Sequence, residues 1–130
     1  LNLNECSQIN YLNQHHLFDI NKLLPEIDIL ITDYSSIATD FMIMDRPVLY
    51  IMPDYDAYLR SYGLLEDILL ELPGYNVSSL EELKKYILVS ILDPLDMSHM
   101  RNKYLKKYYD RDLQNSSSEV SKFIDFLIKK

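Results

Sequence analysis

Two adjacent hydroxyl side chains, Ser35 and Ser36, follow an apolar run and stand where a helix is expected to begin. Thr32 and Asp33 precede them, so four polar side chains surround Tyr34. Hydroxyls and the first backbone N–H groups of a helix all donate hydrogen bonds, and together they can hold a phosphate. A serine at a helix start is more often only a cap, which contributes about 1 kcal/mol. Because a cap does not require so many polar neighbours, we expect a phosphate-binding turn here.

The elements around this turn alternate between strand and helix. Residues 28–32 contain the continuous apolar run Ile29-Leu30-Ile31, typical of a strand covered on both faces. An apolar stripe from residue 35 or 36 to residue 44 indicates a helix, Asp45-Arg46-Pro47 ends it, and residues 48–52 are the next expected strand. We therefore expect an α/β domain with a strand-helix-strand unit. Ligands of such units gather at the carboxyl ends of the strands, where the serines lie.

The remaining segments predict mainly helices. Asp19 caps a brief helix that runs to residue 24 and is ended by Pro25, and residues 54–63 form a tyrosine-rich loop or short helix with Gly63 at its turn. After the Pro73-Gly74 turn, a capping box that begins at Ser78 opens a helix to about residue 92. Its expected buried stripe consists of Leu80, Leu83, Tyr86 or Ile87, and Ile91.

Two further helices are expected at about residues 97–109 and 116–129. The first is basic and rich in tyrosine. The second carries an apolar side that we expect to dock against another surface, formed by Val120, Phe123, Ile124, Leu127 and Ile128.

Composition narrows the class of protein. The 130 residues are 48% hydrophobic, enough for one domain with an ordinary core. A formal net charge of −7 argues against nucleic acid as a partner, because a basic face is needed to displace counterions. The single cysteine, Cys6, has no partner in the chain, which fits a reducing, cytoplasmic setting. A soluble chain is expected, since no apolar run approaches the roughly 20 residues of a membrane span and no secretory leader is present.

Several standard sites do not fit the sequence. Two glycines are too few for a P-loop or a dinucleotide fingerprint. His15 and His16 are adjacent and diverge, and His99 stands alone, so no metal-ligand spacing is present and we expect no metal or cofactor. The chain begins with Leu1 and its first 14 residues are rather polar, so we expect a piece of a longer polypeptide.

The chain resembles the CDP-glycerol glycerophosphotransferase family, whose members build or prime teichoic acids and related surface polymers. The resemblance covers about residues 19–92 and rests on these positions: Asp28-Ile29-Leu30-Ile31-Thr32-Asp33-Tyr34-Ser35-Ser36, Asp40-Phe41, Asp45-Arg46-Pro47-Val48, Tyr50, Asp54, Tyr58, Gly63 and Pro73-Gly74.

This resemblance implies a glycosyltransferase-B architecture, in which two Rossmann-like halves enclose a cleft. Residues 1–130 are then a single donor-binding domain from the C-terminal half, a parallel sheet flanked by helices. The implied activity transfers glycerol phosphate, or ribitol phosphate, from CDP-glycerol or CDP-ribitol to a polymer or lipid-linked acceptor. The implied location is cytoplasmic and peripheral, at the inner face of a bacterial plasma membrane.

The resemblance also assigns site residues. Thr32, Asp33, Ser35 and Ser36 are expected to bind the donor phosphates. No catalytic residue is carried over, because the family's histidine-proline pair on an upstream strand and a second histidine in the other half have no match here. The chain alone is therefore expected to be inactive without the missing N-terminal half.

Two alternatives remain open at this point. A nucleotide-sugar glycosyltransferase of the same architecture would have a similar phosphate turn. The second alternative is a non-catalytic interaction module, in which a basic, tyrosine-rich stretch contacts a membrane surface or a partner. This stretch consists of Lys103, Tyr104, Lys106, Lys107, Tyr108, Tyr109 and Arg111. The simpler interpretation, which we prefer, is a helix whose lysines and arginines are solvated and whose tyrosines pack inward.

Overall fold

The computed structural model describes residues 9, 12, 19–62, 72–109 and 115–129, and within them three short parallel strands form one sheet. In spatial order the strands are β1 (Leu30–Thr32), β2 (Val48–Ile51) and β3 (Tyr75–Val77). Leu30 lies opposite Val48, and Leu49 lies opposite Tyr75. Both predicted strands are confirmed, with slightly tighter bounds. The expectation that the first strand is covered on both faces was wrong, because Ile31 in the middle of β1 is 44% exposed. β3 was not predicted, because three residues directly after a Pro-Gly turn carry too little pattern.

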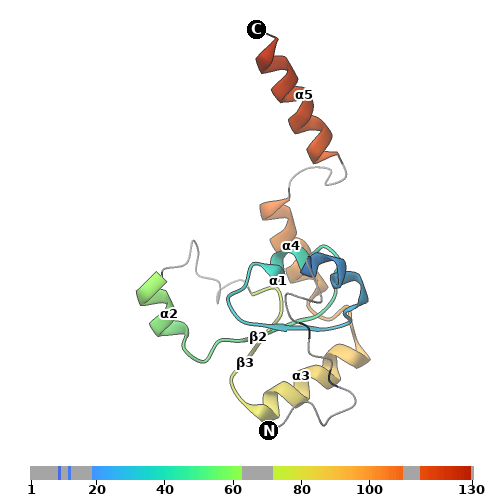
Figure 1. Ribbon diagram of the computed structural model, residues 1–130. Helices are drawn as coiled ribbons and strands as arrows, with labels where there is room; N and C mark the ends of the chain where they lie inside the picture. The colour runs from blue at the N-terminus through green and yellow to red at the C-terminus, as the bar shows by residue number, and fades with distance from the viewer. Residues whose placement is uncertain (1–8, 10–11, 13–18, 63–71, 110–114, 130) are drawn as a thin grey trace.

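Helices cover both faces of this sheet, so the predicted Rossmann-like α/β fold is confirmed. Figure 1 shows α1 and α4 above the sheet and α3 below it, while α2 and α5 stand away from the other helices. The helical elements are the 3-10 turns η2 (Ile20–Lys22) and η3 (Leu24–Glu26), and the helices α1 (Ile37–Met42), α2 (Tyr55–Tyr62), α3 (Leu80–Leu92), α4 (Ser98–Tyr108) and α5 (Ser116–Ile128).

The core lies between the sheet, α1 and α4. Phe41 and Leu49 are fully buried, and Val48 and Met42 are almost so. Leu105 of α4 packs against this cluster as a partly buried neighbour. α1 has only six residues, but it contributes three buried side chains and is therefore held by packing rather than by its length.

Gly74 lets β3 approach β2 closely. A Cβ atom at this position would lie 2.1 Å from the carbonyl oxygen of Val48 and 3.2 Å from the Tyr50 ring. Only a glycine fits here without a shift of the backbone. The Pro73-Gly74 pair thus sets the distance at which the third strand joins the sheet.

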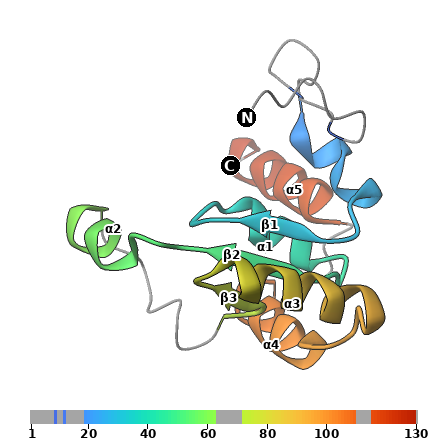
Figure 2. The ribbon, with the colours of Figure 1, turned by 90° about the horizontal axis from the view of Figure 1, so that it is seen from below.

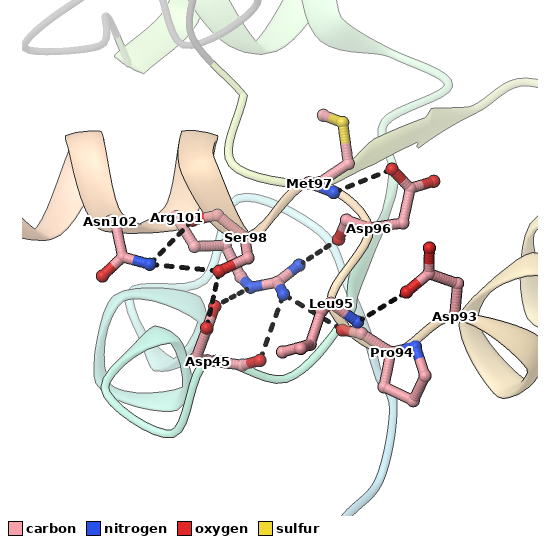
Figure 3. A network of polar contacts seen from close by, with 9 residues as sticks. All are labelled: Asp45, Asp93, Pro94, Leu95, Asp96, Met97, Ser98, Arg101 and Asn102. Atoms are coloured by element: carbon pink, nitrogen blue, oxygen red, sulfur yellow. Dashed lines mark hydrogen bonds and ion pairs between the residues drawn. The ribbon is translucent and has the colours of Figure 1, made fainter.

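A buried arginine fixes α4 to the turn that follows α1. Arg101 is 1% exposed, and its Nε donates to Asp45 Oδ1 at 2.8 Å (Figure 3). Its other nitrogens donate to the carbonyls of Asp45, Pro94 and Asp96. The hydroxyl of Ser98 donates to Asp45 Oδ2 at 2.6 Å. Asp45 has a left-handed backbone (φ 51°), so this network holds a strained turn in place.

The structure differs from the sequence-based prediction at the end of one helix and at the start of another. Asp19 caps η2 as expected, accepting from the Asn21 N–H, but Pro25 lies inside η3 rather than ending a helix. Proline is tolerated there because the first N–H groups of a helix need no internal partner. The cap of α3 is Ser79 rather than Ser78, because the Ser79 hydroxyl accepts from the Glu82 N–H at 3.1 Å.

The predicted apolar face of α3 is partly buried, and that of α5 is exposed. In α3, Leu83, Tyr86 and Ile87 are half-buried, whereas Leu80 and Ile91 are 59% and 61% exposed, so these two were wrongly assigned to the core. In α5 the whole predicted apolar side is exposed. Its expected docking role stays a prediction.

Some sequence-based expectations lie outside the described residues: those on Cys6, His15, His16, Gly63 and Arg111. Among the helices that the structure describes, none is long and apolar enough to cross a membrane.

Candidate functional site at the carboxyl ends of the strands

The turn between β1 and α1 is fixed by its own polar groups. The Ser35 N–H donates to Asp33 Oδ1 at 3.1 Å, and the Ile37 N–H donates to the Ser35 hydroxyl at 3.4 Å. These two N–H groups are therefore occupied, whereas the sequence-based interpretation counted the first N–H groups of the helix among the phosphate donors. The carboxylate of Asp33 shapes the turn in the way that aspartates commonly do.

The serine hydroxyls nevertheless face solvent. Ser35 and Ser36 are both exposed, and Ser36, the residue that begins α1, makes no side-chain cap hydrogen bond. Since the Ser35 oxygen accepts one bond, its O–H remains a donor that can turn to an incoming ligand. The pair thus offers two hydroxyl donors at the start of α1.

A shallow hollow lies beside this turn. It has a volume of about 380 Å³ and is lined by Ile31, Thr32, Asp33 and Ile51. These residues come from the last part of β1, the residue after it and the end of β2, which are neighbouring strands. The structure therefore brings the predicted residues Thr32, Asp33, Ser35 and Ser36 to one edge of the sheet, the carboxyl edge at which α/β folds bind ligands.

Helix α2 stands beyond the same edge, and both views show it apart from the other helices (Figures 1 and 2). It is tied to the turn through Tyr34, whose hydroxyl donates to Asp54 Oδ1 at 3.0 Å. The Tyr34 ring stacks on Tyr58 with centroids 3.9 Å apart and an interplanar angle of 12°. Desolvation, then the hydrogen bond and negative charge of Asp54, raises the pKa of Tyr34 to about 12. Its phenol therefore stays neutral and keeps its donor.

This contact was not found from the sequence. Tyr34 was expected to pack sideways, and residues 54–63 were expected to form a loop or short helix. No contact between Tyr34 and this segment was predicted. A signal was present, because Tyr55, Tyr58 and Tyr62 fall on one helix face at spacings of three and four residues. The partner of that face could not be read from local pattern, since Tyr34 and Asp54 are 20 positions apart.

The basic, tyrosine-rich stretch at α4 is in large part structural. Arg101 is buried in the network around Asp45, and Tyr104 packs against the core. Lys106 and Lys107 are exposed on the same helix. The inward-packing alternative accounts for Tyr104, whereas the burial of Arg101 was not predicted from the sequence. No group of three or more histidine, cysteine, aspartate or glutamate side chains suited to a metal ion occurs among the residues that the structure describes.

Parallel strands whose carboxyl ends carry an exposed polar turn define a Rossmann-like α/β domain, a class of fold that binds its ligands at this edge. Residues 4–125 match the family model of the CDP-glycerol:poly(glycerophosphate) glycerophosphotransferases. The chain belongs to this family, and the resemblance expected from the sequence is confirmed.

Individual relatives agree with the family match. The chain is 34% identical over 122 residues to the teichoic acid glycerol-phosphate primase of Bacillus subtilis (strain 168), an alignment that covers 92% of this chain and 29% of the primase. It is 42% identical over 65 residues to the teichoic acid poly(glycerol phosphate) polymerase of the same strain, covering 49% of this chain and 9% of that protein.

A third relative is named for a different alcohol. The chain is 27% identical over 101 residues to the teichoic acid poly(ribitol-phosphate) polymerase of Bacillus spizizenii (strain ATCC 23059 / NRRL B-14472 / W23), covering 78% of this chain and 16% of that protein. The chain thus spans less than a third of the length of these relatives. No solved structure matches the chain significantly.

Proposed function

We propose that this chain is the donor-binding part of a glycerophosphotransferase and holds the diphosphate of CDP-glycerol, or of CDP-ribitol, at the turn of residues 32–36. Family membership supports transfer of a glycerophosphate group. Relatives named for glycerol phosphate and for ribitol phosphate leave either alcohol open. The observation that carries the proposal is the exposed pair Ser35 and Ser36 at the carboxyl end of β1.

In the proposed reaction the acceptor hydroxyl attacks the phosphorus that bears the alcohol. The bond from this phosphorus to the CMP oxygen breaks, CMP leaves with the electron pair, and the acceptor proton passes to a base. Negative charge therefore grows on the phosphate of the departing CMP. Donors that already point at this charge stabilise the transition state most, because they need not reorganise.

The turn is suited to that role because it is preformed. Asp33 fixes the Ser35 backbone, so the hydroxyls of Ser35 and Ser36 are in place before a ligand arrives. Thr32 adds a third hydroxyl on the wall of the hollow. With a net charge of −7 and no cation among these residues, the domain attracts the donor only through local hydrogen bonds. We therefore expect weak binding.

The rest of the enzyme is proposed to lie outside this chain. A second Rossmann-like half, in a glycosyltransferase-B arrangement, would supply the catalytic histidines and the site for the polymer or lipid-linked acceptor. The short share of each relative that the chain covers supports this division. We place the complete enzyme at the inner face of a bacterial plasma membrane, as a peripheral protein.

Equilibrium dialysis with labelled CDP-glycerol tests the proposal. Replacing both hydroxyls in Ser35→Ala/Ser36→Ala removes two bonds to a charged group and should weaken binding by about tenfold or more. Ser118→Ala/Ser121→Ala, which removes two exposed hydroxyls from α5, is the matched control and should bind like the parent chain. Equal affinity of the Ser35/Ser36 variant and the parent, with far-ultraviolet circular dichroism unchanged, would contradict the proposal.

A further inference from the structure

A row of aromatic rings, the tyrosine row of Tyr34, Tyr58 and Tyr62, runs from the turn along α2. The ring centroids of Tyr34 and Tyr58 are 3.9 Å apart, and those of Tyr58 and Tyr62 are 5.1 Å apart with an interplanar angle of 40°. Tyr55 flanks the row, with its centroid 6.4 Å from that of Tyr34. The row begins at the residue directly before Ser35, so it adjoins the proposed phosphate site.

The inner end of this row is fixed and the outer end is open. Tyr34 and Tyr58 are half-buried, and the hydrogen bond from Tyr34 to Asp54 holds the first ring. Tyr62 is 79% exposed. A single exposed tyrosine is ordinary on a protein surface, but this ring continues a stack that two other rings support. It therefore presents an aromatic surface in a restrained position.

The charges around the row exclude a second anion as its ligand. Asp54 accepts from Tyr34, and Asp56 belongs to the first turn of α2. A phosphate or carboxylate placed against the rings would be repelled by these carboxylates. A neutral, planar group would meet no such cost and would gain the stacking contact.

We propose that Tyr62 stacks on the nucleobase of the donor nucleotide, with Tyr58 and Tyr34 as its support. This inference rests on the proposed function, since it takes the diphosphate to lie at Ser35 and Ser36. Base and phosphates of a nucleotide are joined by one ribose, so an aromatic surface beside a phosphate turn is suited to the base. Stacking is tolerant of base identity, so the row selects a nucleotide over a bare phosphate rather than cytosine over other bases.

Two ligands distinguish the contribution of the base to binding from that of the phosphates. CMP carries both groups, whereas inorganic pyrophosphate carries no base. We would measure the affinity of the 130-residue chain for each ligand by isothermal titration calorimetry. Tyr62→Leu removes the aromatic face at an exposed position, and Tyr62→Phe restores it without the hydroxyl. Tyr108→Leu, at a 46% exposed tyrosine on α4, is the matched control.

The inference predicts that Tyr62→Leu weakens CMP binding by about tenfold and leaves pyrophosphate binding unchanged. Tyr62→Phe and Tyr108→Leu should bind CMP like the parent chain. Unchanged CMP binding in Tyr62→Leu would overturn the inference, and so would an equal loss for both ligands, which would show that the ring acts on the turn. The proposed function fails separately, if Ser35→Ala/Ser36→Ala leaves pyrophosphate binding intact or if the parent chain does not bind CMP.

Discussion

At the scale of single residues, buried and short polar side chains fix the backbone at both ends of α1. Asp33 holds the turn before the helix by accepting from the Ser35 N–H. Asp45 holds the turn after it, through Arg101 and Ser98 of α4. Such contacts matter because a buried charge or carbonyl that loses its partner costs more than the hydrogen bond itself contributed.

Replacing Arg101 by methionine should destabilise the domain. Arg101→Met keeps most of the apolar stem but leaves the carbonyls of Pro94 and Asp96 without their donor. Because Asp45 keeps a side-chain exposure of 34%, water compensates part of the loss, and we expect about 3 kcal/mol. Urea unfolding measures it, with Lys106→Met, an exposed cation on the same helix, as control. A difference below about 1 kcal/mol between the two variants would speak against the network.

The Tyr34 phenol should titrate at unusually high pH. Desolvation and Asp54 raise its pKa to about 12, whereas a tyrosine in an unfolded chain ionises near 10. Between these values the unfolded chain has released the proton and the folded chain still holds it, so stability from this group is lost as pH rises through the window. The difference in ultraviolet titration between the parent and Tyr34→Phe should show one phenol with a midpoint near 12. A midpoint near 10 would contradict the Asp54 contact.

At the scale of elements, the absence of a side chain at Gly74 allows β3 to pair closely with β2. Gly74→Ala would force its Cβ to within 2.1 Å of the Val48 carbonyl oxygen, so β3 must move away from β2. We expect a loss of about 2 kcal/mol or more in free energy of unfolding. Asn76→Ala, at an exposed position of the same strand, should change it by less than about 0.5 kcal/mol. Equal melting temperatures of Gly74→Ala and Asn76→Ala would refute this role of Gly74.

Local sequence patterns predicted some of the elements and missed the contacts between them. The strands at β1 and β2 were predicted because continuous apolar runs are typical of covered strands, and the start of α1 was predicted from the serines. The predicted cap of α3 was one residue too early, because Ser78-x-x-Glu81 and Ser79-x-x-Glu82 fit the same pattern. The Tyr34–Asp54 contact and the burial of Arg101 depend on tertiary packing, so no local pattern could give them. The residues of the candidate turn were therefore named from the sequence, and their phosphate-binding role stays a prediction, whereas the tyrosine row beside them was not foreseen.

At the scale of the whole molecule, the core and α5 are separate. Every described residue of α5 is exposed, including Phe123 and Phe126 at 61% and 56%. Ending the chain after residue 115 should therefore leave the free energy of unfolding, measured with urea, within about 0.5 kcal/mol of the parent. It should also reduce self-association on gel filtration at high concentration, because exposed apolar area is removed. A shorter chain that unfolds at clearly lower urea would show that α5 packs on the core.

The central claim is that the turn between β1 and α1 holds the donor diphosphate. Backbone amide chemical shifts of the isotope-labelled chain, followed by nuclear magnetic resonance during addition of CDP-glycerol, test it most directly. The largest shifts are predicted for the amides of residues 32–37, with smaller ones along α2. Shifts concentrated at the amino ends of the strands or on α3, with residues 32–37 unmoved, would contradict the claim.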